Sequence, residues 1–480
     1  MQVLKLYNTL SREIEDIVPV NSDNKLRIYC CGPTVYNYAH IGNFRTFLVQ
    51  DLLHRMLKIC GYDVIFVRNI TDVDDKTIKN SIISHVSLKE FTEKWTKIFH
   101  EDMLALNILP PTIEPRATDH IQEQISLIQN LIDNNCAYVA KDGSVYFRLN
   151  SFKSYGKLSG IKLENLHTQE SNSAGNKNLS DEYDRDSVQD FALWKSRKPE
   201  DGEVFWNSPW GEGRPGWHIE CSAMAMKYLG EEIDIHCGGI DLCFPHHENE
   251  IAQTECVTNK TFAKHWFHSA HLQVEGQKMS KSLGNLLTLS DLKSKNYDPY
   301  VVRYCLLSGH YRQSLNFTYA GLNSAASALE KIKTKLQNLQ CNISETTENI
   351  QNWTIFYDAF QALLIDLNVP KCLGEIFKIL NTLSGANTFK EDSDKQIFER
   401  ELSILMYIIG VEKFFVNDNS INNDDVASEI PEEIINLAEE RLLCKQQKNF
   451  ARADELRSQI STLGWTIKDT KDGYELMKNA

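Results

Sequence analysis

A strand–loop–helix–strand pattern near the N-terminus constrains the fold more than any other part of the sequence. Residues 25–30 (Lys-Leu-Arg-Ile-Tyr-Cys) and 63–68 (Asp-Val-Ile-Phe-Val-Arg) have the apolar alternation of short β-strands. Between them, apolar side chains recur at helical spacing from Phe44 to Ile59, and Gly61 supplies a stop signal. This order predicts a βαβ unit within an open parallel sheet.

The loop after the first strand carries the sequence His40-Ile-Gly-Asn43. Open parallel sheets bind ligands at the carboxyl ends of their strands, which is where this loop lies. The helix begins at the same point, so its free N–H groups and the positive end of its dipole face the loop. The pattern therefore predicts a binding site for an anionic ligand.

Length and composition set broad limits. The 480 residues suffice for about three domains of ~150 residues, and a hydrophobic content of 42% is ample for large cores. The sequence has no run of ~18 apolar residues and no signal-peptide pattern, which predicts a cytoplasmic protein without a membrane span. The 12 cysteines are scattered, as is typical of reduced thiols. The net charge of −14 says little about nucleic-acid binding, because a local basic face could exist on an acidic body.

Composition and periodicity divide the chain. Pro110-Pro111 ends the first part of the sheet domain, and a helix at 121–134 and a hairpin around Lys141-Asp-Gly143 follow. The segment 167–190 is polar and predicts a surface loop. The predicted organisation is a sheet domain in two halves, at 1–115 and 201–317, an inserted module at 116–200, an α-helical bundle at 318–416, a linker at 417–429 and a small α+β domain at 430–480.

Candidate metal ligands lie at the loop edge of the predicted sheet: Cys31, Cys221, His246 and Glu250. His246 and Glu250 are four residues apart on a predicted helix and therefore face the same way. Thiolate, imidazole and carboxylate together suit Zn²⁺. Spacing alone leaves other sets open, because His247 could act with Glu250, and Cys30 could replace Cys31.

A second group of polar residues follows the strand at 63–68, and it contains Thr71, Asp72, Asp74 and Asp75. Asp is favoured at helix N-caps, so this group could be a solvated loop or the start of a helix. It could equally line a ligand pocket, because this end of the sheet faces the ligand. The sequence leaves both interpretations open.

Two motifs together resemble a known family. His40-Ile-Gly-Asn43, followed far downstream by Lys278-Met-Ser-Lys-Ser282, resembles the paired nucleotide-binding signatures of the class I aminoacyl-tRNA synthetases. Asn43 departs from the commoner terminal His of the first signature. The resemblance implies a Rossmann-like catalytic domain that carries an inserted connective module, followed by a tRNA-binding helical bundle and a C-terminal anticodon-binding domain.

Three further segments resemble the cysteinyl-tRNA synthetases in particular. They are Cys31-Gly-Pro-Thr-Val-Tyr36, the stretch from Arg214 to Met224, and the stretch from Phe244 to Gln253. The resemblance implies that Cys31, Cys221, His246 and Glu250 hold one Zn²⁺ at the floor of the amino-acid pocket. Cys237 stands where the family usually has a glycine, and Cys243 is nearby, but neither belongs to the implied ligand set.

The implied metal has a physical purpose. Serine differs from cysteine by one atom, and a hydrophobic pocket separates such near-isosteres poorly. Zinc binds a thiolate well and lowers the pKa of a thiol, whereas a serine hydroxyl stays protonated and binds weakly. The resemblance therefore implies selection of cysteine without a separate editing domain.

The resemblance also implies the reaction and the roles of site residues. L-cysteine reacts with ATP, accompanied by Mg²⁺, to give cysteinyl-adenylate, and the cysteinyl group then passes to tRNA(Cys). The implied ATP-binding residues are His40, Gly42, Asn43, Lys278 and Lys281, and His40 and the two lysines are the implied catalytic groups. Gly32, Thr71, Trp217 and His236 are the implied cysteine-binding residues. The family further implies a monomer.

Two other functions compete with this interpretation. A ligase that adenylates cysteine and transfers it to an amino sugar has a similar catalytic half but lacks an anticodon module. A non-catalytic regulator derived from a synthetase is the second alternative, and it is expected to have lost His40 or Lys281. In the last domain, Arg441, Lys445, Lys448, Arg452 and Arg457 form a possible basic set, and Trp465 or Tyr474 could stack on a base or belong to the core.

Overall fold

A computed structural model describes residues 2–161, 190–279, 284–385, 388–416, 432–446, 449–462, 465–470 and 473–478. They form two compact units, Met1–Val416 and Asn417–Ala480. The predicted linker at 417–429 and nearly all of the predicted polar loop at 167–190 lie outside the described residues. Among the described residues, no helix is long and apolar enough to cross a membrane.

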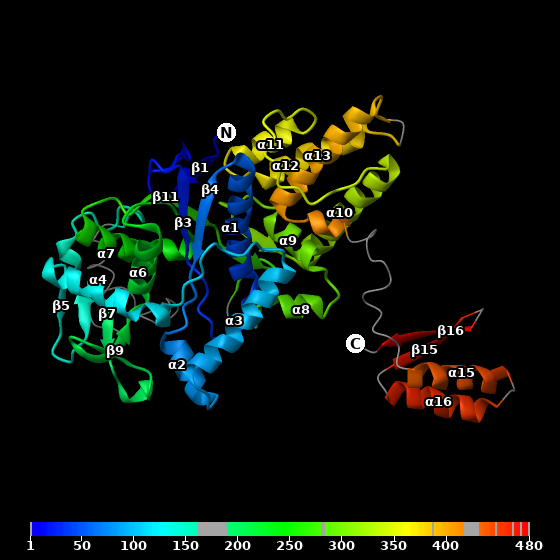
Figure 1. Ribbon diagram of the computed structural model, residues 1–480, viewed down its shortest axis with the longest axis horizontal. Helices are drawn as coiled ribbons and strands as arrows, with labels where there is room; N and C mark the ends of the chain where they lie inside the picture. Colours follow the sequence, from blue (N-terminus) through cyan, green and yellow to red (C-terminus); the bar gives the residue numbers. More distant parts are fainter. Residues whose placement is uncertain are drawn as a thin grey trace. The chain divides into compact units, whose positions relative to one another are not determined.

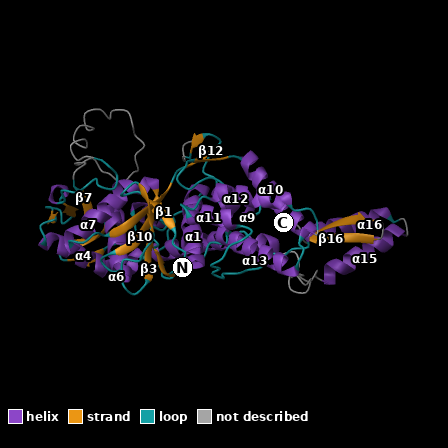
Figure 2. Cartoon of the chain, turned by 90° about the horizontal axis from the view of Figure 1, so that it is seen from above, coloured by secondary structure: helices purple, strands orange, loops and turns teal. Residues whose placement is uncertain are grey.

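A four-stranded parallel sheet forms the centre of the first unit (Figure 1). Its order is β11 (Ala263–Ser269), β10 (Ile233–Gly239), β3 (Lys25–Cys30) and β4 (Asp63–Arg68). Helix α1 (Ile41–Cys60) packs on one face, and α6 (Trp217–Leu229) and α7 (Glu248–Thr258) lie on the other (Figure 2). The structure thus confirms the predicted βαβ unit.

The ends of α1 follow from its flanking residues. Asn43 N–H donates to Nδ1 of His40, and His40 N–H donates to Oδ1 of Asn43, which closes a capping box at the N-terminus. Gly61 ends the helix with φ of 86°, a left-handed conformation that favours glycine. The predicted start and stop signals are therefore both confirmed.

The inserted module is an antiparallel sheet packed against α4 (Ile121–Asp133). Its strands, in spatial order, are β5 (Ala137–Val139), β6 (Val145–Phe147), β7 (Phe191–Ser196), β9 (Gly211–Pro215) and β8 (Trp206–Ser208). The sheet extends to Pro215, beyond the predicted module boundary at residue 200. The sequence did not reveal this, because the strand Gly-Glu-Gly-Arg-Pro of β9 has no apolar alternation.

Further strands and helices belong to the first unit. They are β1 (Lys5–Asn8) and β2 (Glu13–Asp16), α2 (Asp75–Ile83) and α3 (Leu88–Ala105), β12 (Leu272–Val274), β13 (Gln277–Lys278) and β14 (Leu315–Phe317), and α8 (Leu289–Lys293) and α9 (Pro299–Leu307). β12 pairs with both β13 and β14. This small sheet supports the segment that contains Lys278.

The helical bundle shares the core of the catalytic domain. It comprises α10 (Tyr319–Leu339), α11 (Tyr357–Leu364), α12 (Val369–Thr382), α13 (Asp392–Ile409) and α14 (Glu412–Val416). One continuous cluster of buried apolar side chains runs from Leu26 in β3 through α1 to Ile408 in α13. The bundle is therefore fixed to the sheet domain by burial and does not form a separate compact unit.

The second unit contains two helices and a hairpin, which is an α+β arrangement. The elements are α15 (Glu432–Gln446), α16 (Phe450–Thr462), β15 (Trp465–Thr470) and β16 (Gly473–Lys478). Trp465 is 7% exposed in a small core with Ile460 and Ile467, so its side chain is structural and does not offer a stacking surface. Arg441 is also buried, and Arg452 pairs with glutamates at positions 440 and 455, which weakens the predicted basic set.

Candidate functional site

The carboxyl edge of the parallel sheet gathers the predicted site residues. Cys30 in β3 is paired with Arg68 in β4 and with Cys237 in β10, so the residues that follow these strands lie together at the carboxyl edge of the sheet. Cys31 follows β3 directly, and its N–H donates to the carbonyl of Cys237. His236, one residue earlier in β10, is fully buried at the same edge.

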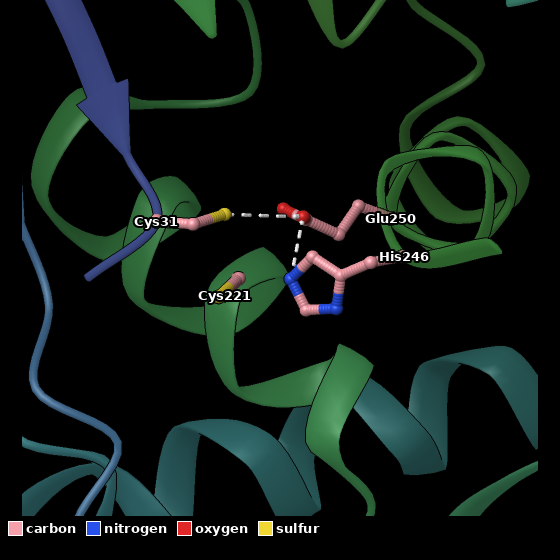
Figure 3. Close-up of side chains that lie close together, drawn as sticks. All are labelled: Cys31, Cys221, His246 and Glu250. Atoms are coloured by element: carbon pink, nitrogen blue, oxygen red, sulfur yellow. Dashed lines mark hydrogen bonds and ion pairs between the residues drawn. The ribbon is translucent and has the colours of Figure 1, made fainter. Parts of the chain in front are cut away.

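The predicted ligand side chains converge from three segments. Cys31 comes from the end of β3, Cys221 from α6, and His246 and Glu250 from the turn before α7 and its first residues (Figure 3). All four are buried, and their candidate ligand atoms lie within 4.8 Å of one another. Atoms that share one zinc ion lie about 3–4 Å apart at bond lengths of ~2.0–2.3 Å. The four ligand atoms would therefore have to move only slightly closer together to share one ion.

The segment before α7 departs from the predicted regular helix. Residues Cys243–His247 form an irregular turn, Phe244 is extended with φ of −137° and ψ of 130°, and the regular helix begins at Glu248. Proline disfavours the helical conformation in the residue before it, which explains the extended Phe244 before Pro245. His246 and Glu250 still face one another, with 3.1 Å between Nε2 and Oε1.

Charge is concentrated around Glu250. Burial raises the pKa of this carboxyl, but His236 and His246 more than offset that effect and lower it to about 2. Oε2 of Glu250 lies 2.9 Å from Nε2 of His236. Burial lowers the pKa of His246, but Glu250 and Cys221 raise it to about 10. Without a metal, the site therefore favours an ionised carboxylate beside a charged imidazole.

The two cysteines differ in proton affinity. Burial, together with the neighbouring Cys221, raises the pKa of the Cys31 thiol well above its usual value. A hydrogen bond from Cys31 is the largest influence on Cys221 and lowers its pKa to about 6, despite the opposing effect of burial. Cys221 is therefore the thiol of this pair that ionises more readily, and a thiolate is the form that binds metal.

The donor set fits a metal ion. Nε2 of His246 is buried and faces Cys221 and Glu250, and its ion pair with Oε1 of Glu250 does not have the geometry of a hydrogen bond. An imidazole nitrogen held in this way beside a thiol and a carboxylate can bind a metal ion when its proton is lost. The set Cys31, His236, His247 and Glu250 also satisfies the same distance test. Geometry thus supports a metal site that includes Cys31 and Glu250, with two possible completions.

A layer of histidines surrounds these ligands. Nδ1 of His246 lies 2.8 Å from Nδ1 of His218, and Nδ1 of His247 lies 2.8 Å from Nε2 of His268. Burial lowers the pKa of His218 well below its usual value, which keeps that ring neutral and able to accept a hydrogen bond. A neutral His218 can therefore hold the proton of His246 on Nδ1 and direct Nε2 toward the ligand cluster.

The two predicted nucleotide motifs lie side by side. A Cβ atom at Gly42 would come within 2.2 Å of Cε of Met279, and Ile41 N–H donates to the carbonyl of Leu287. Lys278 is exposed on β13. Residues 280–283 lie outside the described residues, so the predicted role of Lys281 stays a prediction.

The capping box of α1 determines the state of His40. Nδ1 accepts from the N–H of Asn43, so a neutral ring carries its proton on Nε2. That N–H is a donor suited to a phosphate oxygen. The side chain of Asn43 caps the helix, which gives this position a structural role in addition to the predicted ATP contact.

The predicted cysteine-binding residues lie around the metal ligands. The Trp217 ring packs on the His246 ring with 4.2 Å between centroids, and His236 contacts Glu250. Thr71 is 1% exposed, and its N–H and C=O bond to Pro33 and Val35, which brings it beside the Gly32 loop. The structure therefore brings Gly32, Thr71, Trp217 and His236 to one region.

The aspartates after Thr71 have structural partners. Asp74 caps α2, and Asp72 accepts hydrogen bonds from the N–H and the hydroxyl of Thr118. Asp75 pairs with Lys195 and Arg214 of the inserted module. Of the two interpretations left open by the sequence, the structure supports the helix start and loop contacts for these aspartates.

Sequence reasoning missed three buried residues beside the site. Asn69 bonds to Gly32 and Thr71, His218 bonds to His246, and both carboxylate oxygens of Glu220 are buried without a hydrogen-bond partner among the described residues. Burial raises the pKa of Glu220 well above its usual value. The only available signal was adjacency, because each lies within two residues of a predicted site residue.

Comparison with known proteins decides the family. Residues 17–327 match the model of the class I (C) tRNA synthetase catalytic domain. The chain is 47% identical to cysteine–tRNA ligase of Opitutus terrae over 475 residues, which is 98% of each chain, and 43% identical to that of Brachyspira hyodysenteriae over 99% of each. The chain belongs to the cysteine–tRNA ligase family.

Solved structures of class I synthetases share the fold of this family member. Methionyl-tRNA synthetase of Mycobacterium tuberculosis matches with a TM-score of 0.54 at 13% identity, over 81% of this chain and 90% of that one. A leucyl-tRNA synthetase of Agrobacterium radiobacter matches with a TM-score of 0.56 at 11% identity, over 82% and 85%. These likenesses support the Rossmann-like catalytic domain predicted from the sequence.

Proposed function

We propose that this chain is a cysteine–tRNA ligase, which activates L-cysteine with ATP and transfers the cysteinyl group to the 3′ end of tRNA(Cys). The observation that carries this proposal is the convergence of Cys31, Cys221, His246 and Glu250 at the sheet edge that also holds the paired nucleotide motifs. A soft ligand set beside a nucleotide site suits an enzyme that must recognise a thiol before adenylating it.

The metal of this site is one Zn²⁺, held by Cys31, Cys221, His246 and Glu250. When bound, zinc supplies a soft Lewis acid that favours a thiolate over an alcohol. The packing of Trp217 on His246 supports this set over the one with His236 and His247, because it places a predicted pocket wall against the ligand. His218 acts as the outer partner that fixes the ring orientation of His246.

The nucleotide lies at the start of α1. The carboxylate oxygen of cysteine forms a bond to the α-phosphorus of ATP, and the bond from that phosphorus to the bridging oxygen breaks to release diphosphate. The chain contributes positioning and charge neutralisation. His40 donates a hydrogen bond from its Nε2–H to a phosphate oxygen. Lys278 and Lys281 supply positive charge, and Mg²⁺ accompanies the nucleotide. Gly42 and Asn43 complete the loop around it.

The amino acid binds between the two strand-end loops and α6. Gly32 presents backbone, Thr71 a hydroxyl, Trp217 a ring and His236 an imidazole already aligned by Glu250. The α-helical bundle and the second unit contact tRNA, with the second unit at the anticodon. Support for this part comes from curated relatives that match across both units. The enzyme acts as a cytoplasmic monomer.

The amino-sugar ligase is the less favoured alternative. Its relatives lack an anticodon module, whereas this chain retains a compact unit at Asn417–Ala480 and matches cysteine–tRNA ligases over 98% of their length. The regulator alternative expects loss of a nucleotide-binding residue, yet His40 and Lys281 are both present.

The deciding experiment measures ATP–diphosphate exchange with cysteine or serine, followed by transfer to tRNA(Cys) or to an amino sugar. We expect cysteine-dependent exchange, at least about 10³-fold weaker exchange with serine because the metal selects the thiol, and transfer to tRNA only. Exchange without transfer to tRNA would contradict the proposed acceptor. The absence of exchange with cysteine at full zinc content would contradict the whole proposal.

A further inference from the structure

Asn69 connects the parts of the amino-acid pocket. It is the first residue after β4, and its side chain is 1% exposed. Gly32 N–H donates to its Oδ1 at 2.9 Å, and its Nδ2 donates to Oγ1 of Thr71 at 3.1 Å. Sγ of Cys221 lies 3.9 Å from the same Oδ1. One carboxamide thus contacts the two strand-end loops and α6.

The orientation of this carboxamide is fixed by its neighbours. The N–H of Gly32 can only donate, so Oδ1 of Asn69 must face Gly32. Nδ2 must then face Thr71, whose oxygen accepts. The hydroxyl proton of Thr71 is consequently left to donate to another group. Asn69 therefore determines whether Thr71 presents a donor or an acceptor.

The two loops also touch through their backbones. A Cβ atom at Gly32 would lie 1.6 Å from the carbonyl oxygen of Asn69, so only glycine fits there. Thr71 N–H donates to the carbonyl of Pro33, and Val35 N–H donates to the carbonyl of Thr71. The Asn69 side chain completes this contact on the side that faces Cys221.

We infer that Asn69 is a positioning residue for cysteine binding, acting through the Gly32 amide, the Thr71 hydroxyl and the Cys221 thiol. The inference rests on the proposed function, because it assumes that these three groups meet the amino acid. Removal of the donor Nδ2 of Asn69 should therefore weaken cysteine binding selectively. In the described part of the chain, the hydrogen bonds of this carboxamide go to Gly32, Thr71 and Cys221 and not to the ATP-binding motifs.

The test is Asn69→Asp, which keeps the shape and the acceptor for Gly32 but cannot donate to Thr71. We expect the KM for cysteine and the dissociation constant of cysteine measured by calorimetry to rise about tenfold or more, because the Thr71 hydroxyl would donate to the aspartate and no longer to another group. The KM for ATP should change less than about twofold, and zinc content should stay that of the parent. Asn69→Ser, a smaller residue, carries the same expectation and serves if the aspartate variant does not fold.

Asn8→Asp is the matched control, because Asn8 is 2% exposed and bonds to Glu15, Lys264, Leu10 and Trp266, none of which is a group through which Asn69 acts. It should lower stability and leave the KM for cysteine unchanged. In a Thr71→Val background, Asn69→Asp should raise the KM for cysteine less than about threefold, because the hydroxyl through which Asn69 acts is gone.

The inference would be overturned by equal increases in the KM values for cysteine and ATP, by a rise below twofold for cysteine, or by the full effect persisting in the Thr71→Val background. Cysteine-dependent exchange that is normal in the parent and in the variants would overturn the inference alone. Its absence from the zinc-loaded parent would overturn the proposed function and the inference with it.

Discussion

Two groups of buried ionisable side chains in the first unit differ in the chemical groups that they bring together. The first is the ligand cluster of Cys31, Cys221, His246 and Glu250 at the sheet edge. The second, here called the junction cluster, joins α1 to the bundle and consists of Asp51, Arg55, Arg303 and Glu412. Both are almost completely removed from solvent.

The junction cluster is nearly saturated. Asp51 accepts from Arg55 at 2.8 Å and from Arg303 at 2.5 Å, and it also accepts the N–H of Leu109. Arg303 donates its remaining N–H groups to the carbonyls of Ile409, Leu106 and Asn107. Opposite charges and backbone carbonyls satisfy most of this group, and among its described atoms Oε2 of Glu412 makes no hydrogen bond. The group contains no thiol or imidazole, so it acts in stability.

The ligand cluster differs in the kind of groups that meet. Two thiols, an imidazole and a carboxylate place their candidate ligand atoms within 4.8 Å of one another. The cluster contains no arginine or lysine, whereas Arg55 and Arg303 neutralise the carboxylates of the junction cluster. The comparison teaches that convergence of metal-binding donor types, more than a single unsatisfied atom, distinguishes a binding site from a structural ion network.

The largest expected effect comes from removing a soft ligand. Cys221→Ser should abolish zinc retention and reduce cysteine-dependent ATP–diphosphate exchange by at least about 10³-fold, because a hydroxyl stays protonated and binds zinc weakly. Metal analysis and exchange assays measure both. Cys305→Ser is the matched control, since Cys305 is a buried cysteine packed in the apolar core. Full metal content and normal exchange in the Cys221 variant would remove the distinction between the two clusters.

Breaking the junction cluster should affect stability instead. Arg303→Met removes the hydrogen bonds that Arg303 donates to Asp51 and to the carbonyls of Ile409, Leu106 and Asn107. Among the described residues, Arg55 then remains as the one cation beside the Asp51 carboxylate, so the change should lower the free energy of unfolding by about 3–5 kcal/mol. Denaturant unfolding monitored by fluorescence measures this loss. Zinc content below the unfolding transition should remain that of the parent. A variant with parental stability but lost metal would show that the junction cluster also serves the site.

His218→Phe tests the layer outside the metal ligands. The ring keeps its shape but loses the acceptor for Nδ1 of His246, so zinc affinity should fall about 10- to 100-fold. Competition with a calibrated chelator measures the affinity. His120→Phe is the control, because His120 is a buried histidine that is hydrogen-bonded to Arg116 and Tyr228, neither of which belongs to the ligand cluster. Unchanged affinity in the His218 variant would favour the ligand set with His236 and His247.

The smallest effect is a dependence of stability on pH. Burial raises the pKa of Asp51, but Arg55 and Arg303 more than offset this and hold it below the usual value of about 3.9. A depressed folded-state pKa contributes stability above about pH 4 and loses it as pH falls through the folded value. The stability penalty of Asp51→Asn should therefore be constant from pH 7 to about 5 and shrink below pH 4. Unfolding titrations at each pH measure it, and a penalty that grows in acid would contradict the assignment.

Local sequence determined much of the fold and the identity of the candidate ligands. The strand at Lys25–Cys30, the helix ending at Gly61 and the terminal hairpin depend on near neighbours, so their patterns could be interpreted directly. The paired motifs and the cysteinyl-tRNA synthetase segments likewise identified Cys31, Cys221, His246 and Glu250 without coordinates. For the strand, helix and hairpin the deciding physics acts within a few residues, whereas the ligand set was implied by the family resemblance, because spacing alone left other sets open.

Only the tertiary structure decided which side chains act together. The strands β8 and β9 join the module because β9 pairs with β7, which a weak local pattern could not indicate. Trp465 became core because two helices and a hairpin enclose it. Asn69 meets Gly32 and Cys221 across 37 and 152 residues, respectively. Such contacts depend on how distant segments pack, and hydrogen bonding and burial at that level leave no periodic trace in the sequence.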